Sequence, residues 1–275
     1  TAGQVIAIDG KTARRSYDQS SNKTAIHMIS AWAQKNNLVL GQMKVDDKTN
    51  EITAIPELLR ILAIQGCIVT IDAMGCQKKI AKMIIKRGGA YVLALKENHP
   101  QLYEEVKETF ELCEQGGWGN PAPEYSQTVN KNHGRIEVRK CWVITDIEDL
   151  AYLQEKGSWD GLQSIVKVQS ERTIGENKTT ETRYYLSSIK GNAKKILSAV
   201  RNHWSIENSL HWVLDIAFRE DESRIRKDHA PENFVVLRHV ALNLLNQENS
   251  LKVGIKNKRL TCAWNNDYLL KVLSL

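Results

Sequence analysis

Val5-Ile6-Ala7-Ile8-Asp9-Gly10-Lys11 contains a short apolar run that is followed directly by an aspartate. Cys67-Ile68-Val69-Thr70-Ile71-Asp72 repeats this pattern further along the chain. Unbroken apolar runs of this length are typical of strands that are buried on both faces of a sheet. Each run therefore predicts a buried strand whose last residue is a carboxylate.

The segments around these runs predict a mixed sheet covered by helices. Two β-rich runs separated by a Lys-Asn-Asn turn indicate a hairpin, and Pro56 suits the first turn of a helix. In chain order we expect strands at 4–9, 24–33 and 37–44, a helix from 56, a strand at 67–71, a helix at 77–87 and a strand at 90–95. A hairpin followed by alternating helices and strands favours an α/β fold of the ribonuclease H-like kind, a mixed sheet flanked by helices.

The block from residue 98 to 189 is rich in strands and shows no alternation of strands with helices. We expect a helix at 102–113, a Gly- and Pro-rich loop at 116–123, a hairpin of 125–130 with 135–144 around the turn 131–134, and a hairpin of 162–172 with 180–186. From residue 192 the pattern becomes helical again, with helices expected at 193–218 and 231–246.

These changes of pattern predict a division into domains. We expect a discontinuous ribonuclease H-like core of residues 1–97 and 190–250, a β-rich insertion domain of residues 98–189 before the last catalytic helix, and a C-terminal tail of residues 251–275. The start at Thr1 lacks a methionine and runs at once into an apolar stretch, so we expect an N-terminal region to be missing from this chain.

Composition narrows the class of partner. The formal net charge is +6 and the isoelectric point about 9.0, which favours a polyanion such as DNA. No apolar run approaches the roughly 18 residues of a membrane span, so we expect no membrane partner. The five cysteines are scattered without a Cys-x-x-Cys pair, which argues against a disulfide framework or a thiolate zinc site and fits the cytoplasm.

The two strand-end aspartates carry the first chemical signal. Carboxylates at the ends of adjacent buried strands point into one cleft, where they either raise one pKa or bind a cation. Mg²⁺ prefers a few carboxylates together with water and substrate phosphate. The alternative is that Asp9 and Asp72 are ordinary turn residues at the ends of their strands.

A third carboxylate lies in the segment 201–212. His203, Glu207 and His211 recur every four residues, which places them on one helix face beside an apolar stripe. Glu207 could be a metal ligand or a salt-bridge partner of Arg201 or Arg238. The spacing also permits a zinc site of His203, His211 and a third ligand, although the two histidines are two turns apart.

Several ordered motifs resemble the H-repeat-associated transposases, bacterial insertion-sequence proteins of the DDE superfamily. They are Ala7-Ile8-Asp9-Gly10-Lys11, Ile71-Asp72-Ala73-Met74-Gly75-Cys76-Gln77, Leu95-Lys96-Glu97-Asn98-His99-Pro100, His203 to Asp215, Glu220-Asp221 with Arg224 and Arg226, and Arg238 to Leu245. The resemblance implies a ribonuclease H-like catalytic domain on which Asp9, Asp72 and Glu207 bind two Mg²⁺ or Mn²⁺ ions. It also implies cleavage of DNA at element ends and strand transfer into target DNA, in an active complex that is expected to be a homodimer.

The chain departs from the wider superfamily around the third carboxylate. Val200, His203 and Leu214 stand where a Tyr, Arg and Lys signature is common, so the DNA contacts of that signature do not carry over. On charge alone we expect DNA contacts from Lys11, Lys96, Arg135, Arg139, Arg201, Arg224 and Arg226, with Lys131, His133 and Lys140 beside the two hairpin arginines. The alternatives are a metal-dependent nuclease without strand transfer and a domesticated DNA-binding protein without catalysis.

Overall fold

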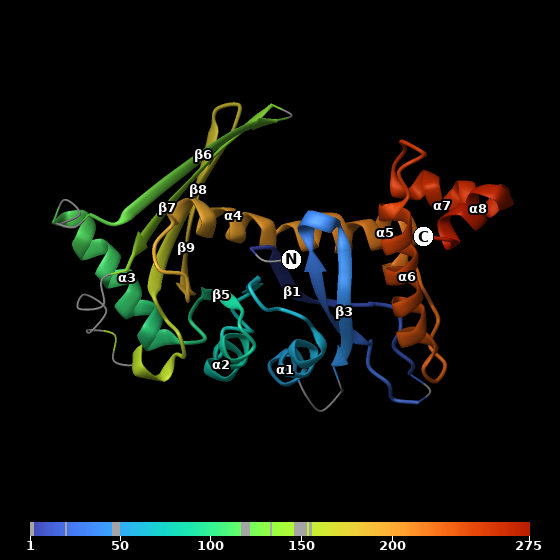
Figure 1. Ribbon diagram of the computed structural model, residues 1–275, viewed down its shortest axis with the longest axis horizontal. Coiled ribbons are helices and arrows are strands. Elements are labelled where there is room, and N and C mark those ends of the chain that lie inside the picture. The colour runs from blue at the N-terminus through green and yellow to red at the C-terminus, as the bar shows by residue number, and fades with distance from the viewer. Residues whose placement is uncertain are drawn as a thin grey trace. The chain divides into compact units, whose positions relative to one another are not determined.

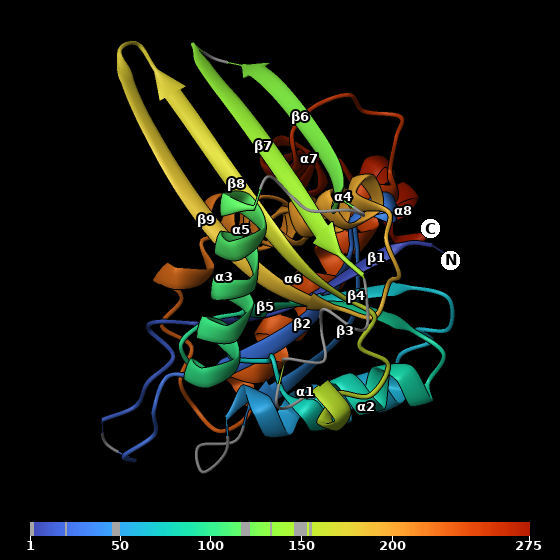
Figure 2. The same ribbon diagram turned by 90° about the vertical axis from the view of Figure 1, so that its left-hand side faces the viewer.

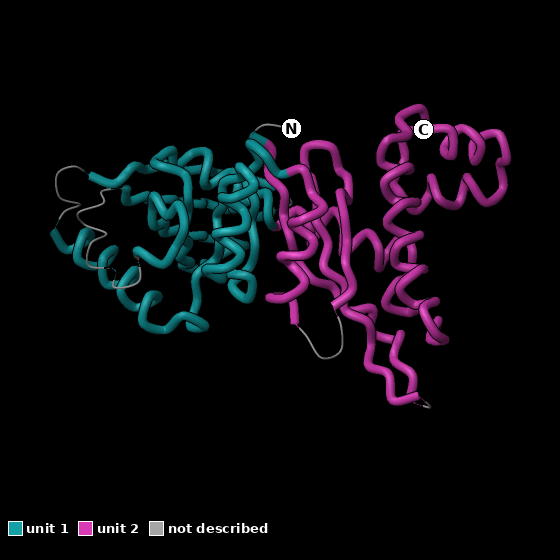
Figure 3. Tube along the Cα trace, turned by 60° about the horizontal axis from the view of Figure 1, so that its bottom comes forward, with its two compact units in different colours: residues 1–3, 64–203 teal, residues 4–63, 204–275 magenta. Residues whose placement is uncertain are grey.

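The computed structural model describes residues 3–19, 21–45, 50–116, 122–132, 134–145, 153 and 156–275. The chain folds into two compact units, coloured separately in Figure 3. Unit 1 contains residues 1–3 and 64–203, and unit 2 contains residues 4–63 and 204–275. Each unit is described by itself.

Unit 2 is built on an antiparallel sheet of the first three strands, β1, β2 and β3. Its elements are β1 (Val5–Thr12), β2 (His27–Ala33), η1 (Gln34–Asn36), β3 (Leu38–Val45), α1 (Glu51–Ile61), the π-helical turn η4 (Glu207–His211), α5 (Trp212–Phe218), η5 (Glu220–Glu222), α6 (Ala230–Gln247), α7 (Ile255–Trp264) and α8 (Asn266–Leu273). Helices α1 and α6 both pack on β3, and Figure 1 shows α6 beside that strand.

One apolar cluster joins the sheet of unit 2 to the helical segment that carries Glu207. Its buried members are Ala7, Trp32, Val39, Ile206, Leu210, Leu214 and Leu242. Ile206, Leu210 and Leu214 recur every four residues and form the buried stripe that the sequence pattern predicts. Burial of this stripe determines which face of the segment is turned away from the sheet.

The C-terminal residues 251–275, for which the sequence pattern predicts no element, form two helices. Tyr268 and Val272 of α8 pack with Leu245 of α6 in a separate apolar cluster. The structure thus extends the helical part of unit 2 beyond the predicted end at residue 246.

Unit 1 contains a mixed sheet in the order β4-β5-β9-β8-β7-β6, in which only β4 and β5 are parallel. Its elements are β4 (Ile68–Ile71), α2 (Lys78–Lys86), β5 (Ala90–Leu95), α3 (Pro100–Gln115), β6 (Glu124–Asn132), β7 (Arg135–Ile144), η3 (Lys156–Ser158), β8 (Ser164–Ile174), β9 (Asn177–Ser187) and α4 (Ala193–His203). Figure 2 shows the four long strands β6 to β9 side by side.

Helices α3 and α4 cover opposite faces of this long-stranded sheet. Glu124 accepts a hydrogen bond from the first backbone N–H of α4, at Ala193. Its neighbour Tyr125 stacks on Trp142, on the face where Lys167 pairs with Glu114 of α3. Neighbouring residues of a strand point to opposite faces, so the two helices lie on different sides.

Most predicted elements are present, but some bounds differ from expectation. The helix expected from residue 56 begins at Glu51, so Pro56 lies inside α1 and not in its first turn. β5 and β7 have the predicted bounds, whereas the helix expected at 193–218 is interrupted at Trp204 and contains the π-helical turn. β9 pairs with β5, so the last strand of the block 98–189 continues the sheet of β4 and β5. The bounds of a core and an insertion domain stay a prediction. His133 and residues 117–121 of the expected loop lie outside the described residues.

Candidate metal centre

Asp9 lies within β1 and is not the last residue of the strand as expected, because β1 stays paired with β2 as far as Thr12. The residues before it in β1 are buried, and Asp9 itself is half-buried opposite Ser30 of β2. Gly10 lets side chains approach this point closely, since a Cβ built there would lie 2.1 Å from Glu51 Oε1. Glu51 in turn pairs with His27, at 2.6 Å between Oε1 and Nε2. The glycine is therefore needed for space.

Glu207 begins the π-helical turn. The backbone N–H of Trp212 donates to the carbonyl of Glu207, a hydrogen bond that spans five residues in place of four. Single π-helical turns inside α-helices are frequent at functional sites. The buried Leu210 anchors this turn on the sheet, and the turn presents Glu207 and His211 together.

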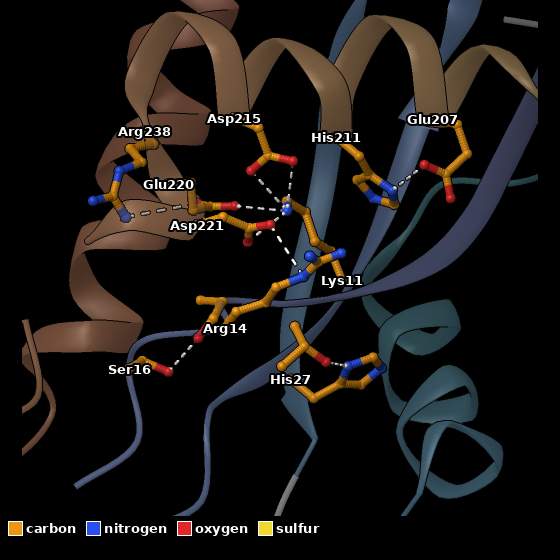
Figure 4. Close-up of polar contacts among 12 residues, drawn as sticks. Lys11, Arg14, Ser16, His27, Glu207, His211, Asp215, Glu220, Asp221 and Arg238 are labelled. Atoms are coloured by element: carbon orange, nitrogen blue, oxygen red, sulfur yellow. Dashed lines mark hydrogen bonds and ion pairs between the residues drawn. The ribbon is translucent and has the colours of Figure 1, made fainter. Parts of the chain in front are cut away.

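Asp9, Glu207 and His211 form a group whose spacing suits a metal ion. Within the part of the chain that the structure describes, their ligand atoms all lie within 4.8 Å of one another. His211 Nδ1 lies 3.4 Å from Glu207 Oε2 and 3.7 Å from Asp9 Oδ2. Figure 4 shows the His211 ring directed at the Glu207 carboxylate.

The same contacts keep Glu207 ionised. A hydrogen bond from His211 lowers the pKa of the Glu207 carboxyl, against the opposing effect of burial, and the charges of His211 and Lys11 lower it further. Two carboxylates and an imidazole are a donor set that divalent cations accept. The residues present therefore fit a cation.

Asp72 follows β4 in unit 1, where it is half-buried. Its Oδ1 accepts a hydrogen bond of 3.2 Å from the backbone N–H of Gly75, which orders the turn after the strand. This contact is also what the turn-residue interpretation expects. The convergence of Asp72 with Asp9 and Glu207 stays a prediction.

The alternative partners weighed for Glu207 make other contacts. Arg238 Nη1 lies 3.6 Å from Glu220 Oε1, and Arg201 donates to the side-chain oxygen of Asn130. His203 Nδ1 lies 3.1 Å from Thr70 Oγ1, and His203 is not among the three grouped residues. The histidine in the group is His211.

Lys11 lies in a cluster of acidic side chains that the sequence did not reveal. Its Nζ is 2.9 Å from Asp215 Oδ1, 3.2 Å from Asp221 Oδ1 and 4.0 Å from Glu220 Oε2, as Figure 4 shows. Burial lowers the pKa of Lys11, but the hydrogen bond to Asp215 and the nearby carboxylates outweigh it, so the pKa is raised. We expected Lys11 to neutralise phosphate; in the structure its ammonium group already neutralises carboxylates.

Three predicted DNA-binding arginines are gathered on one face of the β6–β7 hairpin. Arg135 and Arg139 both pair with Glu137, at 3.3 Å and 2.6 Å. Arg139 and Arg201 both donate to Asn130, which lies opposite Glu137 in the strand register. This arginine cluster, Arg135, Arg139 and Arg201, has more cationic than anionic groups.

The remaining predicted DNA-binding residues do not join that cluster. Lys96 is exposed just after β5 in unit 1. In unit 2, Arg224 is exposed, and Arg226 donates to the Arg15 carbonyl and covers the Tyr17 ring at 4.7 Å. Among the helices that the structure describes, none combines the length and apolarity needed to cross a membrane.

Known proteins resemble this chain in sequence and in fold. Residues 1–244 match the family described as Transposase DDE domain. The chain is 43% identical over 274 residues to putative protein YbfL and likewise to H repeat-associated putative transposase YhhI, both of Escherichia coli K12; each alignment covers 98% of this chain and 71% of the relative. It is 50% identical over 145 residues to H repeat-associated putative transposase YbfD of the same strain, over 53% of this chain and 56% of that relative.

A solved structure is also similar. A piggyBac transposase synaptic complex with hairpin DNA matches with a TM-score of 0.51 at 12% identity, over 100% of this chain and 55% of that chain. At such identity the likeness shows the fold alone. It confirms the predicted fold class, an α/β fold of the ribonuclease H-like kind.

Proposed function

This chain belongs to the Transposase DDE domain family, a family of enzymes that cut and rejoin DNA, and from that premise we propose that Asp9, Asp72 and Glu207 together hold two divalent cations, Mg²⁺ or Mn²⁺. The observation that carries the proposal is the approach of Asp9 and Glu207 to His211, with ligand atoms within 4.8 Å. Residues almost two hundred positions apart meet there as a donor set for a cation.

The chemistry follows from what these side chains do. Two bound divalent cations would stabilise the attacking and leaving oxygens of a phosphodiester. Asp9 and Glu207 supply fixed negative charge, and the lowered pKa of Glu207 keeps it anionic at neutral pH. Leu210 and Leu214 belong to the apolar cluster that holds the Glu207 segment against β1. The carboxylates of Asp9 and Glu207 therefore need little reorganisation to bind a cation.

We assign DNA contact first to the arginine cluster. The guanidinium groups of Arg135 and Arg139 share one glutamate, Glu137, and Arg201 donates to the uncharged Asn130, so positive charge remains for phosphates. Lysine and arginine contacts to phosphate supply most of the sequence-independent affinity for DNA. Lys96, Arg224 and Arg226 remain weaker candidates, and cutting at two element ends implies a homodimer in the active complex.

The test is cleavage of double-stranded DNA that carries the ends of the element encoding this chain. We expect nicking with Mg²⁺ or Mn²⁺, followed by joining of the freed 3′-hydroxyl to target DNA. Asp9→Asn, Asp72→Asn and Glu207→Gln should each lower cleavage by at least about 100-fold, beyond the usual cost of losing an outer-shell group. Glu222→Gln, an exposed glutamate paired with Arg219, is the matched control and should cleave normally.

The products separate the alternatives. Cleavage that needs all three carboxylates but yields no joined product would indicate a nuclease. Tight DNA binding without cleavage under either metal would indicate a domesticated DNA-binding protein. Normal cleavage by Glu207→Gln would remove Glu207 from the metal site.

A further inference from the structure

His211 is the most buried member of the metal-centre group. Its side chain is buried, whereas Asp9 is half-buried and the Glu207 carboxylate is exposed. We propose that the imidazole of His211 is itself a ligand of the cation that Asp9 and Glu207 bind, and that this nitrogen makes the centre prefer first-row transition ions such as Mn²⁺ over Mg²⁺. The inference rests on the proposed function and adds to it a ligand and a metal class.

The spacing of the three donor atoms supports ligation. Two ligands on opposite sides of a cation are separated by roughly 4.2 Å, which is twice a metal–ligand bond of about 2.1 Å. His211 Nδ1 lies 3.4 Å from Glu207 Oε2 and 3.7 Å from Asp9 Oδ2, both below that limit. One cation can therefore reach all three atoms with small side-chain adjustments.

The fold directs one ring nitrogen at the carboxylates. Nδ1 is the nitrogen near Asp9 and Glu207, whereas Nε2 is buried without a hydrogen-bond partner among the described residues. Leu210, the preceding residue, is fully buried in the core of unit 2, which fixes the backbone that carries the ring. Turning the ring toward solvent would expose a side chain that the fold buries.

The other groups near His211 do not compete with a cation for its ring nitrogen. His239, on α6, is the other buried histidine of unit 2, and burial followed by the charges of His211, Arg238 and Lys11 lowers its pKa to about 3. Lys11 and Arg238 also lie near His239. Lys11 is paired with Asp215, and Arg238 is paired with Glu220. A divalent cation at Nδ1 would stand between the carboxylates of Asp9 and Glu207.

A nitrogen donor changes the choice of metal. Mg²⁺ takes oxygen ligands and keeps several waters, while imidazole suits first-row transition ions. A site of three carboxylates alone would supply the oxygen ligands that Mg²⁺ prefers. Two carboxylates with an imidazole on one cation give Mn²⁺ an advantage that Mg²⁺ lacks.

Pulsed electron paramagnetic resonance of Mn²⁺ added to the full chain tests the inference directly. We expect nitrogen coupling to the Mn²⁺ electron spin, with the change in pattern that ¹⁵N-labelled histidine produces. His211→Gln should lose the coupling and bind Mn²⁺ about 10-fold more weakly by calorimetry, the lower end of what a metal-site partner contributes, while Mg²⁺ binding changes far less. His229→Gln, which removes a histidine whose side chain is 86% exposed, is the control and should retain both.

Two other outcomes would each overturn a different claim. If wild type binds Mn²⁺ without nitrogen coupling, and Asp9→Asn and Glu207→Gln both lose that binding, ligation by His211 is refuted. The proposed metal centre then remains intact. Mn²⁺ binding that neither carboxylate variant weakens would refute the proposed centre. Because the coupling is measured on the wild-type chain, the test does not depend on the folding of His211→Gln.

Discussion

Lys11 is the residue whose position in the fold most changes its interpretation. As part of Asp9-Gly10-Lys11 it looks like a phosphate contact, but its side chain is only 14% exposed and lies among Asp215, Glu220 and Asp221. Burial raises the pKa of Glu220, as do the charges of Asp215 and Asp221, and Lys11 and Arg238 oppose that rise. The ammonium group therefore offsets the repulsion of a partly buried acidic cluster.

Lys11→Met should lower the free energy of unfolding by about 3 kcal/mol, because removing the ammonium group leaves the clustered carboxylates of Asp215, Glu220 and Asp221 with less compensating charge. The methionine keeps the apolar stem, so the loss reports the charge. Lys11→Arg, which keeps the charge, should recover most of the stability. The measurement is urea unfolding at pH 7, well below the raised pKa of Lys11, where its stabilising contribution is fully present.

Arg14→Met provides the matched control for Lys11. Arg14 pairs with the same Asp221 at 3.2 Å, but its side chain is 79% exposed. Exposed ion pairs contribute about 1 kcal/mol or less. Equal losses from Arg14→Met and Lys11→Met would contradict a buried role for Lys11.

At the scale of elements, the β6–β7 hairpin carries the DNA prediction. Arg135 and Arg139 share Glu137, and burial, which raises the pKa of Glu137, is outweighed by the hydrogen bond from Arg139 and the charges of both arginines. That glutamate is therefore anionic and neutralises only part of the arginine charge. We expect the remaining charge to contact phosphates.

The double variant Arg135→Glu/Arg139→Glu should weaken DNA binding and make its salt dependence less steep. Each lost phosphate contact reduces the slope of log affinity against log salt by about 0.9, so two lost contacts change it by nearly 2. Fluorescence anisotropy with a duplex of random sequence at several salt concentrations measures the slope. Arg60→Glu, on α1 and paired with Glu57, should leave the slope unchanged; a slope equal to wild type in the hairpin variant would refute the contact.

The two C-terminal helices depend on Glu248. Its carboxylate accepts hydrogen bonds from Ser250, the Leu251 N–H and the Tyr268 hydroxyl, the last at 2.8 Å. The Ser250 hydroxyl contributes most to lowering the pKa of Glu248 to about 2, against the opposing effect of burial. The last helix is thus tied to the end of α6 by an ionised group.

Glu248→Gln should destabilise unit 2 at neutral pH and remove an acid-dependent part of its stability. Because the folded pKa lies below the ordinary value of 4.5, the contribution of Glu248 is present above about pH 4.5 and is lost as the pH falls toward 2. The stability difference between wild type and Glu248→Gln should therefore shrink over that range. Circular dichroism melts from pH 7 to pH 3 measure it, with Glu232→Gln on the same α6 as the control; a constant difference would contradict the assignment.

At the scale of the whole molecule, the three predicted ligands are distributed over both compact units. Asp9 and Glu207 belong to unit 2 and Asp72 to unit 1. If the triad holds shared cations, metal binding must stabilise the native chain against unfolding. A ligand at 100 times its dissociation constant adds about 2.7 kcal/mol.

Asp72→Asn should abolish most of the rise in melting temperature that Mn²⁺ produces, as should Asp9→Asn. The double variant should lose little more than either single variant, because residues that share one ligand are not additive. Differential scanning fluorimetry of wild type, the two single variants and the double variant, with and without Mn²⁺, provides the four shifts in melting temperature. If Mn²⁺ raised the melting temperature of Asp72→Asn as much as that of wild type, Asp72 would act only as a turn residue, through its hydrogen bond with Gly75.

Much of this protein could be predicted from the sequence by itself. The apolar runs before Asp9 and Asp72 and the apolar stripe that contains Leu210 and Leu214 are local signals. The strands and helices that they predict are present. Ordered motifs along the chain also sufficed for the family resemblance, which the comparisons confirm. Local patterns succeed here because backbone geometry and burial repeat over a few residues.

Only the tertiary structure decided which polar side chains meet. Lys11 and Asp215 are 204 residues apart in sequence, and no spacing rule links them. His211 was recognised as sharing a helix face with Glu207, but its approach to Asp9 depends on how the π-helical turn packs on β1. A π-helical turn and the partners of buried charges are determined by packing across the whole core, where desolvation must be compensated by whichever groups the fold brings near.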